Sequence, residues 1–193
     1  MAEPAGLKKF VGPLAIESAI RFFDGAVPDW STALSISIPR RKVVNRLVNF
    51  FESAGTSGVP IVGLLLAAGC EGKTTAILQA AYEIGKRGKW CILQRRDESQ
   101  EFLGHELLSV MTGDFSWLIL IDEADNCVHQ LLSFFQNLPD ELQGRVHCLL
   151  ACRDSDWRAS GAENLNWRVG VSLRSERLSG LDIADAQSIV SAW

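Results

Sequence analysis

Residues 64–78 read LLLAAGCEGKTTAIL, and this stretch decides how the rest of the chain folds. An apolar run stops at small residues, a turn with two glycines follows, and an apolar pattern with helical spacing starts after Gly-Lys-Thr. A bound phosphate needs a strand that stops, several backbone N–H groups that converge, and a helix N-terminus behind them. The order of these residues therefore predicts a phosphate-binding turn between a buried strand and a helix.

The turn supplies each group that a nucleotide site requires. Gly69 and Gly72 are expected to give the backbone its freedom, Lys73 to reach the β- and γ-phosphates, and Thr74 to offer its hydroxyl to Mg²⁺. Ala67 holds a position where the usual motif has glycine, and a small side chain at the strand end is what that position needs. The alternative, a flexible surface turn, is disfavoured by the strand before it and the helix after it. The residues expected to contact the nucleotide here are Ala67, Ala68, Gly69, Cys70, Glu71, Gly72, Lys73, Thr74 and Thr75.

From residue 59 the apolar residues follow a new rhythm, in which short runs alternate with amphipathic stretches. The runs are PIVGLLLA (60–67), KWCILQ (89–94), WLILID (117–122) and RVHCLLAC (145–152). Continuous apolar runs are typical of strands buried on both faces, and their alternation with helices implies parallel strands joined by right-handed crossovers. A fifth strand is expected around 168–178. The fold class is therefore α/β, with a five-stranded parallel sheet and helices on both faces.

The first 58 residues are expected to be helical and connecting. PLAIESAIRFF (13–23) has apolar residues at helical spacing, and DGAVPDWS (24–31) interrupts the pattern with Gly and Pro. A second helix is predicted within 39–55, with Pro39 at its opening and Gly55 at its exit. Its apolar face would carry Val43, Val44, Leu47, Val48 and Phe51.

Two carboxylates follow the apolar run in WLILIDEADN (117–126). Asp122, at a strand end, is expected to hold Mg²⁺ through its water shell. Glu123 is expected to polarise the attacking water. A hydrolase needs such a carboxylate, whereas an enzyme that transfers phosphate to another substrate does not. Acidic residues often close strands, so the weight of this motif comes from its place one strand–helix unit after the phosphate turn. Asp125 is interpreted as a helix N-cap rather than a ligand.

A fixed positive charge ends the run in VHCLLACRDSDW (146–157). Ligands of parallel sheets bind at the carboxyl ends of the strands, so Arg153 is expected to sense or stabilise the γ-phosphate. The alternative is a surface arginine paired with Asp154 or Asp156. The expected catalytic residues are thus Lys73, Glu123 and Arg153, and the expected metal-binding residues are Thr74 and Asp122.

Composition limits the other classes of function. The chain has 193 residues, 47% hydrophobic and 22% charged, with a net charge of −4 that gives no reason to expect a nucleic-acid footprint. The five cysteines form no CxxC pair, and four of them lie in or beside apolar runs, where cysteine is a small buried hydrophobe. A disulfide framework or zinc site is not expected, which indicates a reducing cytoplasm. The three histidines lack ligand-like spacing and are interpreted as surface or satisfied core residues. Neither a signal peptide nor a membrane-spanning run is predicted.

Together these motifs resemble those of STAND-type ATPases, relatives of the AAA+ proteins. AAGCEGKTT (67–75) resembles a Walker A motif, LILIDEAD (118–125) a Walker B motif with a catalytic glutamate, and CLLACR (148–153) the family's strand-plus-arginine sensor. SIPRRKVVNRLVNFF (37–51) is similar to a segment that lies near the base and ribose in this family. There Pro39 replaces a glycine and Arg40 matches the arginine, which implies that Arg40 contacts the nucleotide.

The end of the chain, ERLSGLDIADAQSIVSAW (176–193), is similar to the entry into the family's helical lid domain. Asp182 suits its N-cap, and Ala186, Ile189 and Val190 lie on one face of the expected helix. The implied domains are a helical N-terminal segment and linker (1–36), a P-loop NTPase core (37–178) and the start of a truncated lid (179–193).

The resemblance implies a molecular switch that binds ATP and Mg²⁺ and hydrolyses ATP slowly. The chain resembles the NTPase modules of bacterial antiphage defence proteins. This likeness implies self-association or effector and sensor domains outside this chain. One alternative is a nucleotide-binding scaffold or degenerate fragment without hydrolysis. A small-molecule kinase is disfavoured by Glu123 directly after Asp122, and a GTPase by the absence of an Asn-Lys-x-Asp sequence.

Overall fold

The computed structural model describes residues 27–36, 38–54, 56, 58–95, 99–167 and 170–192. The helix predicted at 13–23 and the exit glycine Gly55 lie outside the described residues. The described elements are α2 (Trp30–Ala33), α3 (Lys42–Phe50), β1 (Ile61–Ala67), α4 (Lys73–Gly85), β2 (Trp90–Gln94), α5 (Gly104–Val110), β3 (Ser116–Ile121), η1 (Ala124–Cys127), α6 (Val128–Gln136), η2 (Asp140–Leu142), β4 (Val146–Arg153), α7 (Asp154–Ala159), η3 (Ala162–Asn164), β5 (Ser172–Leu178) and α8 (Ile183–Ala192).

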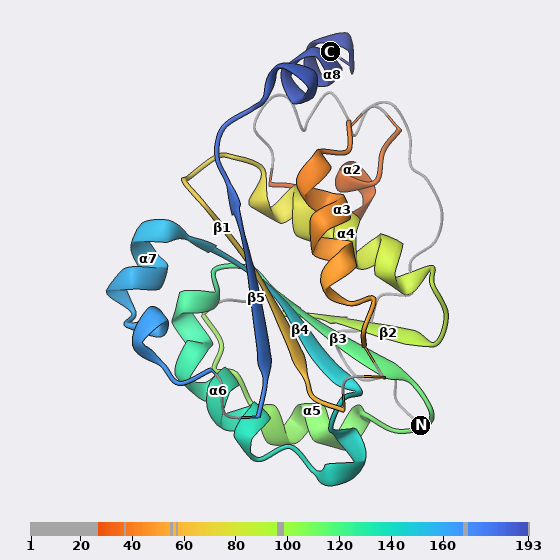
Figure 1. Cartoon of the computed structure of the whole chain (residues 1–193), viewed down its shortest axis with the longest axis vertical. Helices are drawn as coiled ribbons and strands as arrows, with labels where there is room; N and C mark the ends of the chain where they lie inside the picture. Colours follow the sequence, from red (N-terminus) through yellow and green to blue (C-terminus); the bar gives the residue numbers. More distant parts are fainter. Residues whose placement is uncertain are drawn as a thin grey trace.

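The centre of the molecule is a five-stranded sheet with the order β2-β3-β4-β1-β5 (Figure 1). Each neighbouring pair is parallel, so every strand delivers its carboxyl end to the same edge. This confirms the α/β fold class and the four apolar runs predicted as strands. The fifth strand begins at Ser172 and pairs only with β1, and half-buried residues alternate with exposed ones along most of its length. Because an edge strand is covered less fully, its sequence alternates in polarity and its start was harder to predict.

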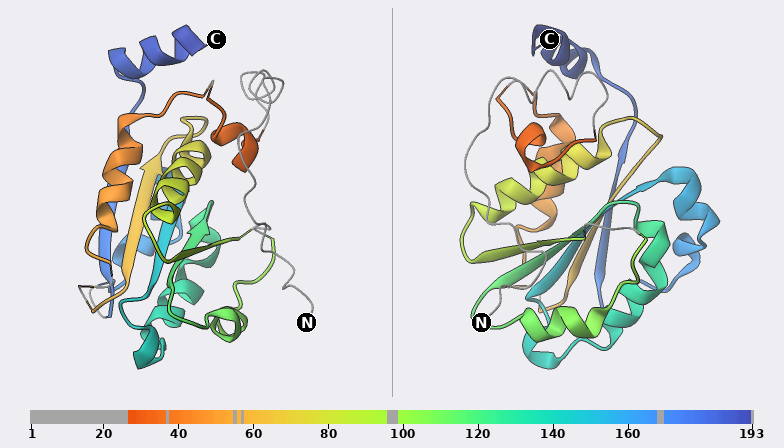
Figure 2. Two further views of the ribbon diagram at one scale, coloured as in Figure 1. Left: turned by 90° about the vertical axis from the view of Figure 1, so that its right-hand side faces the viewer. Right: turned by 180° about the vertical axis from the view of Figure 1, so that it is seen from behind.

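Helices cover both faces of the sheet, as the sequence predicts (Figures 1 and 2). Alternate side chains of each strand enter two separate cores. One core joins the sheet to α3 and α4 and includes Leu47, Leu65 and Ile77. The other joins it to α6 and α7 and includes Leu131 and Trp157. Continuous apolar strands are the consequence, since both side-chain directions are buried.

Helix α3 has the apolar face that was predicted, with Val43, Val44, Leu47 and Val48 buried. Its last turn lies very close to β1 at Gly63. A Cβ atom at Gly63 would lie 3.1 Å from Phe50 Cδ2, 3.2 Å from Phe51 Cζ and 3.3 Å from Leu149 Cδ1. The missing side chain therefore sets how closely α3 packs against the sheet.

His147 is buried on β4, at the start of the strand. Its Nδ1 accepts a hydrogen bond of 3.1 Å from the Ile61 backbone N–H, so the proton of the neutral ring is on Nε2. The ring packs against Trp90, with the centroids 5.3 Å apart, and against Phe51 at 6.2 Å. Burial among these groups lowers the pKa of His147 from 6.5 to about 4, although the Gly144 carbonyl acts in the opposite direction. The histidine is thus a neutral core residue, as one of the two sequence interpretations has it, while His105 and His129 are exposed.

Three of the five cysteines, Cys127, Cys148 and Cys152, are buried, and all five are free thiols. Cys70 is exposed in the phosphate turn. Among the described helices, none combines the length and the apolar character that crossing a bilayer would require.

We expect Gly63→Ala to lower the free energy of unfolding by about 1–3 kcal/mol, because the added methyl group overpacks the contact between α3 and β1. Gly85→Ala is the matched control. There the new Cβ would lie 3.6 Å from Ile92 Cγ1, an ordinary contact distance. Because alanine loses less conformational entropy on folding than glycine, the free energy of unfolding should rise by up to about 1 kcal/mol. Urea unfolding measures both, and a Gly63→Ala chain as stable as its parent would contradict the packing argument.

The burial of His147 predicts a loss of stability in acid. Between pH 6.5 and about 4 the unfolded chain binds a proton at this residue that the folded chain does not, so stability falls as the pH is lowered through this window. The full effect is on the order of 3 kcal/mol, at roughly 1.4 kcal/mol per pKa unit. His147→Asn keeps an acceptor for Ile61 but does not titrate, so its unfolding free energy should depend less steeply on pH. Urea unfolding at several pH values measures this. If the unfolding free energies of the two proteins depended equally on pH, the role given to His147 would be wrong.

Candidate functional site

The predicted phosphate turn lies at the carboxyl edge of the sheet, between the end of β1 at Ala67 and the start of α4 at Lys73. Gly72 has φ +81°, in the left-handed region where glycine is favoured. Cys70 also has a positive φ, of 60°, whereas Gly69 does not. The sequence therefore predicted one of the two special backbone positions correctly and placed the other one residue too early.

Lys73 folds back over this turn. The residue is 7% exposed, and Nζ donates a hydrogen bond of 3.3 Å to the Ala68 carbonyl oxygen. A partly buried ammonium group favours an anion beside it, and the converging N–H groups of a helix N-terminus add to that preference. The turn and its lysine together suit a phosphate.

The two residues predicted to hold a metal ion are brought into contact. The Thr74 hydroxyl donates a short hydrogen bond to Asp122 Oδ2, while Asp122 Oδ1 accepts one of 3.0 Å from the Glu123 N–H. A hydroxyl and a carboxylate are the hard oxygen ligands that Mg²⁺ prefers. Within the described part of the chain, no group of three or more His, Cys, Asp or Glu residues could hold a metal ion. This donor set fits Mg²⁺, which usually keeps several waters and shares phosphate oxygens, better than ions that need a full protein cage.

Glu123 and Arg153 face one another beside this pair. The Arg153 Nε lies 4.0 Å from Glu123 Oε1 and 3.9 Å from Asp156 Oδ2. The pairing with Asp156 is the alternative that the sequence left open, and the role of Arg153 toward a γ-phosphate stays a prediction. Arg153 is the register partner of Ala67 at the strand ends, which places it next to the start of the turn. Glu123 has left-handed backbone angles, φ 45° and ψ 55°. Such a conformation is unusual for a residue with a side chain, and strained residues of this kind cluster at functional sites.

The prediction for Asp125 is wrong. Asp125 lies inside the short helix η1, and its Oδ1 accepts a hydrogen bond of 3.2 Å from the Cys152 thiol. Burial, followed by the neighbouring Asp125 carboxylate, raises the pKa of Cys152 to about 12, so the sulfur keeps its proton and remains the donor. This bond ties η1, which follows Glu123 directly, to the end of β4.

Arg40 does not contact the turn, and its expected contact with the nucleotide stays a prediction. Its guanidinium pairs with Glu83 at 3.3 Å, near the end of α4 opposite the turn. The neighbouring Arg41, which sequence reasoning passed over, contacts the turn instead and donates a hydrogen bond of 2.8 Å to the Glu71 carbonyl oxygen. Two adjacent arginines look alike in a sequence, and only the direction of each side chain separates them.

Helix α8 lies beyond the same edge of the sheet (Figure 1). Asp182 is its N-cap, as predicted, because Oδ1 accepts a hydrogen bond of 2.7 Å from the Asp185 N–H. Of the face expected to be apolar, Ala186 and Ile189 are half-buried and Val190 is exposed.

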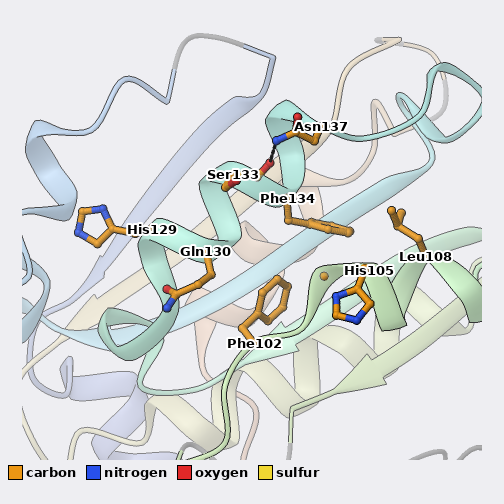
Figure 3. Close-up of a pocket in the computed structure, with 9 residues that line it drawn as sticks. Phe102, His105, Leu108, His129, Gln130, Ser133, Phe134 and Asn137 are labelled. Atoms are coloured by element: carbon orange, nitrogen blue, oxygen red, sulfur yellow. Dashed lines mark hydrogen bonds between the residues drawn. The ribbon is translucent and has the colours of Figure 1, made fainter.

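A separate groove runs between α5 and α6 (Figure 3). The Cβ that Gly104 lacks would lie 2.7 Å from Phe134 Cδ2, which explains how closely these helices approach. None of its lining residues belongs to the predicted nucleotide site. They are Phe102, Gly104, His105, Leu108, His129, Gln130, Ser133, Phe134 and Asn137.

Solved structures share this fold at low sequence identity. Cdc6p from Pyrobaculum aerophilum matches with a TM-score of 0.51 and 13% identity over 86% of this chain and 53% of its own. The ORC2 protein of Aeropyrum pernix matches with a TM-score of 0.54 and 14% identity over 80% of this chain and 52% of its own. RIF2 from Saccharomyces cerevisiae matches with a TM-score of 0.51 and 12% identity over 82% of this chain and 62% of its own. The chain therefore spans about half to three-fifths of the length of these proteins, and at such identities the likeness shows the fold alone.

No curated protein matches the sequence. A family model, described as Novel STAND NTPase 5, matches residues 20–165. This range contains the turn, both carboxylates and Arg153, and it is well over half of the chain. The protein therefore belongs to the Novel STAND NTPase 5 family.

Proposed function

We propose that this chain is a switch module that binds ATP with Mg²⁺ at the 67–75 turn and hydrolyses it slowly. The observation that carries the proposal is the contact between Thr74 and Asp122, next to the buried residue Lys73. It brings an oxygen pair suited to Mg²⁺ and a cation suited to phosphate to one end of α4. The Aeropyrum pernix structure is described as containing ADPNP and ADP, which supports adenine nucleotides as the ligand class.

Each side chain has one role in this proposal. Lys73 holds the β- and γ-phosphates, and Thr74 and Asp122 hold the metal, which when bound neutralises phosphate charge. Glu123 accepts a proton from the water whose oxygen attacks the γ-phosphorus, while the bond from that phosphorus to the bridging oxygen breaks and its electrons stay on ADP. Arg153 stabilises the charge on the γ-phosphate oxygens.

The switching role rests on slow turnover coupled to a change of shape or assembly. The family and the AAA+-like fold support a nucleotide-dependent module. A signalling or defence role, with self-association or with effector and sensor domains outside this chain, is the fuller form of the proposal.

A nucleotide-binding scaffold without hydrolysis is the second candidate. The ion pair between Glu123 and Arg153 favours it, because a carboxylate paired with a guanidinium is not free to orient a water. In the ATPase, a γ-phosphate has to draw Arg153 away from Glu123. In the scaffold, the two stay paired when nucleotide is bound.

Lys73→Ala should weaken ATP binding about 10- to 100-fold, because the strongest charge-assisted contact to phosphate is lost. Isothermal titration calorimetry with Mg²⁺ and ATP measures this. Lys86→Ala is the control, since it removes the same charge from the other end of α4, where Lys86 pairs with Glu83. Equal affinity of the Lys73→Ala chain and its parent would exclude the site.

Glu123→Gln should keep ATP affinity and lower phosphate release by at least about 100-fold, the size of a general-base contribution. The control is Glu163→Gln, on an exposed glutamate 4.0 Å from Arg158 and outside the site. A parent chain that binds ATP and releases no phosphate would decide for the scaffold.

A further inference from the structure

Arg41 joins the phosphate turn to the segment that begins α8. Its side chain is only 12% exposed, and its guanidinium donates in three directions. Nη1 bonds to the Glu71 carbonyl oxygen at 2.8 Å, Nε to Asp185 Oδ2 at 3.0 Å, and Nη2 to the Gly180 carbonyl oxygen. Glu71 and Asp185 are far apart in the sequence, and Arg41 is bonded to both.

The contact at Glu71 fixes a peptide plane in the turn. The Glu71 carbonyl and the Gly72 N–H belong to one planar trans unit, so they point to opposite sides of the chain. With the carbonyl held by Arg41, the Gly72 N–H is turned away from Arg41. Hydrogen bonding of the carbonyl to a cation also polarises the unit and strengthens that N–H as a donor. Gly72 is the residue directly before the phosphate-binding Lys73 of the proposed site.

The segment after β5 also contacts Glu71 directly. The Gly180 N–H donates to Glu71 Oε1 at 3.3 Å, so both the backbone and the side chain of Glu71 are engaged by the same network. A second ion pair, between Lys42 Nζ and Asp182 Oδ2 at 2.8 Å, also holds this segment, but both of its side chains are largely exposed. Of the two neighbouring cations, Arg41 contacts the turn and the segment, whereas Lys42 bonds to Asp182 in the segment.

We propose that Arg41 is a positioning residue that couples the conformation of the phosphate turn to the docking of residues 180–192. This inference rests on the proposed nucleotide site for its functional consequence. Nucleotide at the turn fixes the peptide plane that Arg41 also holds, and so favours the docked helix. By linkage, docking of the helix strengthens nucleotide binding by the same factor, typically 5- to 150-fold for coupled sites.

The first test needs no nucleotide. Asp185→Asn weakens the Arg41 network from the α8 side, and hydrogen-exchange mass spectrometry of the full chain should show at least about threefold faster exchange in peptides covering residues 66–80. Arg41→Ala should speed exchange both there and in residues 180–192. Lys42→Ala removes the same charge from the next residue and should affect only residues 180–192. Parent-level exchange at 66–80 in the Asp185→Asn chain would overturn the proposal.

The second test adds Mg²⁺ and ATP. We expect nucleotide to slow exchange of residues 180–192 in the parent and in Lys42→Ala, but not in Arg41→Ala at saturating ATP. Arg41→Lys keeps the charge without the planar fork, so it should restore part of the affinity and little of the protection. Equal protection in Arg41→Ala and the parent would overturn the coupling. If the parent binds no nucleotide, the proposed function fails, and the nucleotide-free test still decides the role of Arg41.

Discussion

The hydrogen bond between the Thr74 hydroxyl and the Asp122 carboxylate is the contact on which the rest of the site depends. The two residues follow β1 and β3, which are not neighbours, because β4 lies between them. Their contact exists only because all strands are parallel and end at one edge. Parallel strands in turn require crossover helices, and those helices bury both sheet faces, which is why the strands read as unbroken apolar runs. The same constraint therefore produces both the sequence pattern and the assembly of the site.

Three cations at this edge each have a partner in the structure. Arg153 faces Glu123 and Asp156, Arg41 faces Asp185, and the Lys73 ammonium group contacts a carbonyl oxygen. In the proposed site, a phosphate in the turn would offer Lys73 and Arg153 a new partner, whereas Arg41 would keep its bonds to the Glu71 carbonyl oxygen and Asp185. Such an arrangement suits a protein whose conformation follows its ligand, because the cations already have a second partner to which they can return.

The sequence was sufficient for features that depend on local rules. Strand positions followed from unbroken apolar runs, and the turn followed from Gly-Lys-Thr between a strand and a helix. Features that depend on the direction of a side chain were missed. The sequence predicts an N-cap at Asp125, but the fold places Cys152 beside it. The sequence also gives no sign that Arg41 contacts the turn. Cys70 took the left-handed conformation expected of a glycine, because the path of the turn outweighed the local preference.

Helix α8 shows why the polar contacts of Arg41 matter more than their number suggests. Ile183 and Val190 are 79% and 72% exposed, so apolar burial contributes little to the docking of this helix on the described residues. The Lys42–Asp182 pair is also largely exposed, and such pairs contribute about 0–1 kcal/mol. What remains is the half-buried network around Arg41, which also includes the phosphate turn. Because one network contributes most of the polar contacts of this helix, a ligand that acts on that network can shift the balance between docked and undocked states.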